Sequence, residues 1–180
     1  MIHISTDCVF SGKKGNYQES DQSDAEDLYG RTKFLGEVTD HPYIITLRTS
    51  IIGRELTTRL GLIEWFLSQK DGDTIRGYKR AIFTGFTTDE LSRIIMNAVI
   101  PHPELTGLYH ISSDPINKYD LLQMVNQTFR RKINIVPDED FFMDRSLSST
   151  LFRQATGYQP PSWPEMIQEM AKDVQIYNKD

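Results

Sequence analysis

The chain has 180 residues, of which 38% are hydrophobic, 11% aromatic and 25% charged, a composition typical of a folded globular protein that excludes disordered and membrane-spanning classes. Its formal net charge of −5 argues against nucleic acid or an anionic membrane as a partner. With one cysteine, Cys8, four scattered histidines and no segment typical of a signal peptide or a membrane span, we expect a cytoplasmic protein that binds no metal.

Strands and helices alternate in the first third of the chain. Apolar alternation predicts a strand over residues 2–10, and a polar, acid-rich stretch predicts a surface loop over residues 12–27. A helix is expected over residues 29–39, stopped before Pro42, and a β-branched strand follows over residues 43–48. Strand, helix and strand in this order favour a parallel sheet with crossover helices.

Capping residues mark several helices in the rest of the chain. Thr87 with Glu90, and Ser162 with Glu165, have the spacing of a capping box, and Asn117 is a candidate N-cap. These signals and the apolar periodicity predict helices over residues 62–67, 87–98, 117–129, 146–156 and from 162 onward, and short strands over 81–83, 108–111 and 133–136. With no internal repeat and no linker, we expect these elements to form one body.

A phenol and an ammonium lie four residues apart in the first predicted helix. Tyr29 and Lys33 therefore share one helix face and can reach one ligand. Thr6 and Ser5 lie near the end of the strand before it, and ligands bind at the carboxyl ends of strands in open α/β sheets. Tyr-x-x-x-Lys also occurs by chance, so the alternative is a tyrosine that packs and a lysine that is solvated.

Three runs of sequence carry a resemblance to a known family. They are similar to the active-site stretch of the extended short-chain dehydrogenase/reductase family, and within it to sugar-nucleotide reductases of the dTDP-4-dehydrorhamnose reductase type. The runs are Ile4–Gly12, Tyr17–Glu19 and Tyr29–Glu37, with further similarity at Leu47–Ser50, Phe86–Thr88 and Gly107–Ser112.

The resemblance implies an α/β fold in two parts. Residues 1–53 would form the C-terminal part of a Rossmann-type parallel sheet with helices, carrying the active-site tyrosine and lysine. Residues 54–180 would form a smaller, mixed α/β substrate-binding region with segments that return to the core.

The resemblance also implies a reaction. A hydride passes from NADPH or NADH to the C4 ketone of a nucleotide-linked deoxysugar in a polysaccharide pathway, and Tyr29 donates a proton to the ketone oxygen. Lys33 stabilises the phenolate and hydrogen-bonds the nicotinamide ribose, so Tyr29 and Lys33 are also the cofactor-binding residues. Thr6, or less favourably Ser5, hydrogen-bonds the ketone oxygen. The cofactor is thus NADP or NAD, the ligand is a nucleotide sugar, and a homodimer is the expected assembly.

The sequence departs from the family in two places. It contains no Gly-rich loop after a strand, which is the segment that binds the cofactor's diphosphate, so we interpret the chain as the larger part of a longer enzyme. Cys8 stands where the family commonly has a tyrosine, and it shows no evident base or cationic neighbour in the sequence.

Two other functions remain open at this point. One is an epimerase or dehydratase of the same extended family, and the other is a non-catalytic sugar-nucleotide-binding or regulatory subunit. Guanidinium groups for a nucleotide diphosphate would come from arginines, but the spacing assigns none of the five candidates, Arg48, Arg54, Arg59, Arg76 and Arg80.

Overall fold

A parallel sheet of three strands forms the first structural unit. The computed structural model describes residues 1–55, 57, 58 and 60–172. Strands β1 (Ile2–Thr6), β2 (Ile45–Thr49) and β6 (Gly107–His110) lie in the order β1-β2-β6, all parallel. All five residues of β2 are buried, as expected for the central strand of a parallel sheet covered on both faces.

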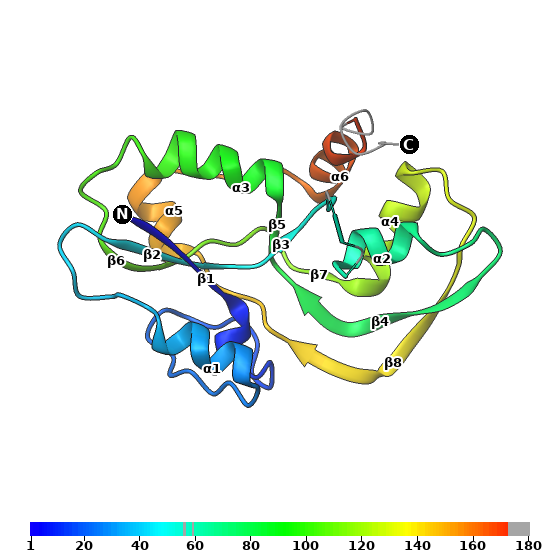
Figure 1. The fold of residues 1–180 in the computed structure, drawn as a ribbon, viewed down its shortest axis with the longest axis horizontal. Helices are drawn as coiled ribbons and strands as arrows, with labels where there is room; N and C mark the ends of the chain where they lie inside the picture. Colours follow the sequence, from blue (N-terminus) through cyan, green and yellow to red (C-terminus); the bar gives the residue numbers. More distant parts are fainter. Residues whose placement is uncertain (56, 59, 173–180) are drawn as a thin grey trace.

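Helices cover the two faces of this sheet (Figure 1). Helix α1 (Leu28–Leu35) lies below it in the view, and α3 (Thr88–Ile94) and α5 (Thr150–Thr156) lie above it. The α3 helix continues as the π-helical segment η2 (Ile95–Val99), and the 3-10 turn η1 (Asp7–Val9) follows β1 directly. Because all three strands run the same way, their carboxyl ends meet at one edge of the sheet, beside α1.

A second sheet lies beside the first at these carboxyl ends. Strand β4 (Thr74–Phe83) is its centre, flanked by the antiparallel β7 (Ile116–Asn117) and the parallel β8 (Asn134–Asp144). Helix α4 (Lys118–Thr128) packs on β4 and β8. Figure 1 shows β4 and β8 side by side as a curved ribbon at the lower right.

The remaining elements join the two sheets. Strands β3 (Ile51–Ile52) and β5 (Phe86–Thr87) form a short parallel pair between them, and α2 (Leu62–Leu67) and α6 (Trp163–Lys172) lie near α4. One hydrophobic core runs through both units, since buried side chains of β2, β8, α4, α5 and α6 belong to the same cluster. No described helix is long and apolar enough to span a bilayer.

A small separate cluster anchors the long loop after β1. Phe10 stacks on Tyr17 with ring centroids 4.1 Å apart, and Val9 and Leu147 complete the cluster. An isolated parallel bridge joins Tyr17 to Leu147. The loop predicted over residues 12–27 is therefore held against the segment that follows β8.

The structure confirms the predicted α/β class with a parallel sheet and corrects several boundaries. The first strand ends at Thr6, not residue 10, because residues 7–9 turn into η1. The first helix ends at Leu35, and the helix expected from residue 146 begins only at Thr150. The division of the chain at residue 53 stays a prediction.

Two strands are far longer than predicted. The strand expected over residues 81–83 is the ten-residue β4, and that expected over 133–136 is the eleven-residue β8. Seven of the eleven residues of β8 and four of the ten residues of β4 are exposed, and both strands are rich in charged side chains, so neither shows the apolar alternation of a half-buried strand. Their pairing with each other, across about 60 residues of chain, stabilises them instead.

Candidate active site

The three residues predicted for catalysis line one cavity. It has a volume of about 290 Å³ and lies at the carboxyl ends of β1 and β2. Thr6 ends β1, Tyr29 and Lys33 come from α1, and Cys8 and Ser50 contribute further wall. The structure thus brings together a hydroxyl, a phenol and an ammonium that are up to 27 residues apart in the chain.

Helix α1 is held against the sheet by contacts that are mostly polar. Asp27 caps the helix, its Oδ1 accepting the Gly30 N–H at 2.7 Å. A Cβ on Gly30 would lie only 2.2 Å from the carbonyl oxygen of Cys8, so a glycine is required for this close approach. Lys33 Nζ donates to the carbonyl oxygen of Ile4 at 2.7 Å. The cap fixes the start of the helix, and the contacts of Gly30 and Lys33 with Cys8 and Ile4 place its Tyr29–Lys33 face over the end of β1.

The two hydroxyls of β1 have different partners. Ser5 Oγ donates to Glu37 Oε1 at 2.6 Å, so its single hydrogen is directed away from the cavity. Thr6 Oγ1 accepts the N–H of Cys8 at 3.2 Å and lies 3.2 Å from Asp7 Oδ1. Thr6 is 7% exposed, whereas Tyr29 is 57% exposed.

A buried ion pair lies behind the cavity and was not predicted. Arg48 on β2 donates from Nε and Nη2 to the two carboxylate oxygens of Glu37, at 2.8 and 2.7 Å, and both side chains are at most 3% exposed. His110 at the end of β6 lies 3.3 Å from Arg48 Nη1 through its Nε2. The pair ties the chain just after α1 to the centre of the sheet. Glu37 lies inside the motif that carries the family resemblance, but the sequence does not indicate its partner.

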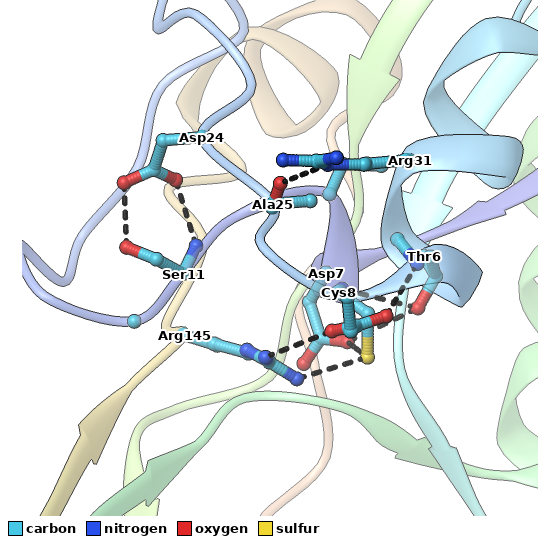
Figure 2. A network of polar contacts seen from close by, with 12 residues as sticks. Thr6, Asp7, Cys8, Ser11, Asp24, Ala25, Arg31 and Arg145 are labelled. Atoms are coloured by element: carbon cyan, nitrogen blue, oxygen red, sulfur yellow. Dashed lines mark hydrogen bonds and ion pairs between the residues drawn. The ribbon is translucent and has the colours of Figure 1, made fainter.

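Cys8 has a cationic neighbour, which contradicts the expectation from the sequence. Arg145, at the end of β8, donates from Nη1 to Cys8 Sγ at 3.1 Å (Figure 2). Burial nevertheless raises the pKa of the thiol, and the neighbouring Asp7 raises it further. Cys8 is therefore a neutral wall residue of the cavity, and a nucleophilic role is not supported.

A second cavity of about 410 Å³ lies between α2, β4 and α4. Its walls are apolar and aromatic, with Trp65 and Tyr78 beside aliphatic side chains. Arg76 and Lys118 are the charged residues that line it, and both are cations. Among the described residues, none forms an ion pair or hydrogen bond with the Lys118 ammonium. Burial lowers the pKa of Lys118, and the charge of Asp7 opposes that shift.

The structure separates the five candidate arginines. Arg48 and Arg54 form ion pairs within the protein, and Arg80 lies over an aromatic ring. Arg76 lines the second cavity and pairs with Asp138 at 3.5 Å, and Arg59 lies outside the described residues. Arg145, which lies nearest the first cavity, was not among the candidates because the sequence places it 137 residues from Cys8.

Comparisons with known proteins agree with this architecture. The family model described as the RmlD substrate binding domain matches residues 1–176. The structure of a hypothetical dTDP-4-dehydrorhamnose reductase from Sulfolobus tokodaii is 25% identical with a TM-score of 0.73, covering 90% of this chain and 61% of that one. The dTDP-4-dehydrorhamnose reductase from Bacillus anthracis, solved in complex with NADP, is 20% identical with a TM-score of 0.79, covering 96% and 65%.

A more distant structure shares the fold alone. It is a UDP-N-acetylglucosamine 4-epimerase from Methanobrevibacter ruminantium in complex with UDP-N-acetylmuramic acid, 12% identical with a TM-score of 0.75, covering 97% of this chain and 62% of that one. No curated protein sequence matches the chain. The chain spans 61–65% of the length of the reductase and epimerase structures described here. The family match confirms the resemblance that the motifs predicted, and the chain belongs to the RmlD substrate binding domain family.

Proposed function

We propose that this chain binds a nucleotide-linked deoxysugar and carries the catalytic groups for NAD(P)H-dependent reduction of its 4-keto group. The observation that carries the proposal is the convergence of Thr6, Tyr29 and Lys33 on one cavity at the carboxyl end of the parallel sheet. In open α/β sheets this edge is where ligands bind. The structures that the chain matches are longer, since it covers 61–65% of their length, so substrate, cofactor and reaction are part of this proposal.

Tyr29 is the proton donor in this scheme. A free phenol has a pKa of about 10, so it needs a nearby positive charge to exchange its proton near neutral pH. Lys33, one helical turn further on, supplies that charge. Its ammonium has three hydrogens and uses one on the carbonyl oxygen of Ile4, which leaves two for the phenolate and a ligand.

The donor set of the first cavity fits the nicotinamide end of the cofactor. Lys33 presents donors suited to a ribose hydroxyl, and Tyr29 lies on the same helix face. When bound, a reduced nicotinamide supplies the hydride. The chain has no Gly-rich loop for the diphosphate, so that part of the cofactor would need groups from outside this sequence.

The second cavity suits the nucleotide. Trp65 and Tyr78 offer flat aromatic surfaces for a base, and Arg76 and Lys118 offer positive charge to phosphate oxygens. Arg76 also pairs with Asp138 at 3.5 Å, so Lys118 is the lining cation without an ion-pair partner among the described residues, and its ammonium favours an anionic ligand.

A turnover assay tests the proposal. Oxidation of NADPH and of NADH is followed with and without a dTDP-4-keto-6-deoxy sugar. We expect ketone-dependent oxidation that falls about 10²–10⁴-fold in Tyr29→Phe, because that variant loses the proton donor. Tyr43→Phe, at an exposed tyrosine outside both cavities, is the matched control. Isomerisation without net oxidation would instead support an epimerase, and binding without turnover a sugar-nucleotide-binding subunit.

Calorimetric titration with dTDP tests the second cavity independently of turnover. Stacking of a base on an aromatic side chain contributes about 1–3 kcal/mol, so Trp65→Ala should weaken dTDP binding about tenfold or more. Met96→Ala removes an exposed apolar side chain from η2 and is the control. Equal affinities in the two variants would exclude Trp65 from the nucleotide site. The homodimer and the cytoplasmic location implied by the resemblance stay predictions.

A further inference from the structure

The long loop between β1 and α1 is fastened to the end of β8 and the chain that follows it. The Asp144 N–H donates to the carbonyl oxygen of Gly12 at 2.8 Å. The Tyr17 N–H donates to the carbonyl oxygen of Ser146, also at 2.8 Å. A Cβ on Gly12, whose φ is +86°, would lie 3.1 Å from Arg145 Cγ, so the stem of this side chain lies against the loop. The backbone is therefore fixed on both sides of Arg145.

From this fixed start, the Arg145 guanidinium reaches both ends of the same loop (Figure 2). Nη1 donates to Cys8 Sγ at 3.1 Å, in the turn after β1, and Nη2 lies 3.8 Å from Asp27 Oδ2, at the start of α1. The Asp7 carboxyl beside Cys8 faces the same positive charge. The donors of a guanidinium are fixed relative to one another in a plane. When two of them are held by different partners, the distance between those partners is fixed as well.

Asp27 connects this contact to the first turn of α1. Its other carboxylate oxygen, Oδ1, accepts the Gly30 N–H at 2.7 Å, and its carbonyl oxygen accepts the Arg31 N–H at 3.2 Å. One carboxylate thus joins Arg145 to the turn that carries Tyr29. Gly30 is the only buried residue of this helix, so apolar packing contributes little to its attachment. Polar contacts therefore decide where the phenol lies.

We propose that Arg145 is a positioning residue that holds the Tyr29 phenol in place beside Thr6. It acts through the two loop ends that it contacts, and it is not one of the residues that line the first cavity. The inference rests on the proposed function, in which Tyr29 protonates the ketone oxygen of the substrate. A proton donor must lie within hydrogen-bond distance of that oxygen, so a displacement of about 1 Å would slow the reaction up to about 100-fold.

Hydrogen exchange measured by NMR tests the attachment of α1 without any substrate. In Arg145→Met the amides of Gly30 and Arg31 should exchange about tenfold faster than in wild type, because a charged contact to the helix cap is lost. Arg131→Met is the matched control. Arg131 pairs with Asp71, and the side chains of that pair are 26% and 53% exposed, against 20% and 51% for Arg145 and Asp27.

The comparison of the two variants decides whether the contact is local. Arg131→Met should leave the exchange of Gly30 and Arg31 at the wild-type rate, because its ion pair stays intact when α1 alone detaches. Unchanged exchange of these two amides in Arg145→Met overturns the proposal. Equal acceleration in both variants also overturns it, since α1 would then open only when the whole fold unfolds.

Turnover separates positioning from substrate binding. Arg145→Met should lower kcat about 10–100-fold and change the KM for the ketone by about twofold at most. Arg145→Lys should recover part of the loss, because an ammonium can still face Asp27 but lacks the paired donors of a guanidinium. A raised KM with kcat unchanged would make Arg145 a substrate-binding residue and would overturn the proposal.

A double variant tests whether Arg145 acts through Asp27. In Asp27→Asn the side-chain oxygen can still cap α1, but the negative charge is gone. Its effect on kcat should be smaller in the Arg145→Met background than in wild type, and additive losses would mean that the two residues act independently. Absence of turnover in wild type would refute the proposed reductase function and leave hydrogen exchange to decide whether Arg145 holds α1.

Discussion

The buried His110 should make the stability of this protein depend on pH. Arg48 can only donate, so the His110 Nε2 that faces it must accept, and the ring hydrogen sits on Nδ1, which donates to the carbonyl oxygen of Tyr17 at 3.1 Å. Burial, and secondly the charge of Arg48, lower the pKa of His110 from 6.5 to about 4. Between these pH values the unfolded chain binds a proton that the folded chain lacks.

The size of the effect follows from that interval. One pH unit corresponds to about 1.4 kcal/mol, so His110 should reduce the free energy of unfolding by about 3 kcal/mol as pH falls from 6.5 to about 4. Above 6.5 the contribution is constant, because the ring is neutral in both states. The contribution of His110 to the free energy of unfolding is fully present above its unfolded-state pKa of 6.5. It is lost as pH falls from that value through its folded-state pKa of about 4.

Urea unfolding followed by tryptophan fluorescence measures this loss. The free energy of unfolding is compared near neutral pH and near the folded pKa of His110, in wild type, in His110→Asn and in His41→Asn. The asparagine at 110 can still donate to Tyr17 but does not titrate, so its pH-dependent loss should be about 3 kcal/mol smaller than that of wild type. The exposed His41 serves as the control. Equal losses in wild type and His110→Asn would refute the assignment of a buried neutral imidazole.

Two further predictions concern how α1 and the segment after it are attached. Gly30→Ala should destabilise the fold by about 1–3 kcal/mol, because its Cβ would meet the carbonyl oxygen of Cys8. Gly36→Ala is the control: the atom nearest to its added Cβ would be 3.5 Å away, so the free energy of unfolding should change little. Glu37→Gln should cost about 3–5 kcal/mol by leaving the buried Arg48 charge uncompensated, and Glu37→Leu with Arg48→Met should restore most of that loss. Denaturant midpoints measure both effects. If Glu37→Leu with Arg48→Met loses as much free energy of unfolding as the two single variants together, the second prediction is wrong.

The grouping of Thr6, Tyr29 and Lys33 around one cavity could be predicted because its signals are local. Tyr29 and Lys33 are one helical turn apart, and Thr6 ends an apolar strand, so spacing and strand polarity were enough to place them together. The structure puts these three residues on one cavity, as expected.

The rest of the site depends on pairs that are distant in sequence. Arg145 reaches Cys8 across 137 residues, and Arg48 reaches His110 across 62. Nothing in the local pattern around Arg145 distinguishes it from the other arginines, since its role comes from where β8 ends. The lengths of β4 and β8 could not be predicted for the same reason, because the two strands are stabilised by pairing with each other across about 60 residues of chain.

Helix α1 buries little of its surface, so the proposed site can lose its structure while the rest of the fold stays intact. Gly30 is the only buried residue of this helix, and Leu28 and Leu35 at its two ends are 78% and 81% exposed. Detaching it would bare little of the hydrophobic core, so the helix can loosen while both sheets stay intact. The proposed site should therefore lose its geometry at a lower temperature or denaturant concentration than the rest of the fold, and assays of folding alone would overestimate the share of molecules in which the site is intact.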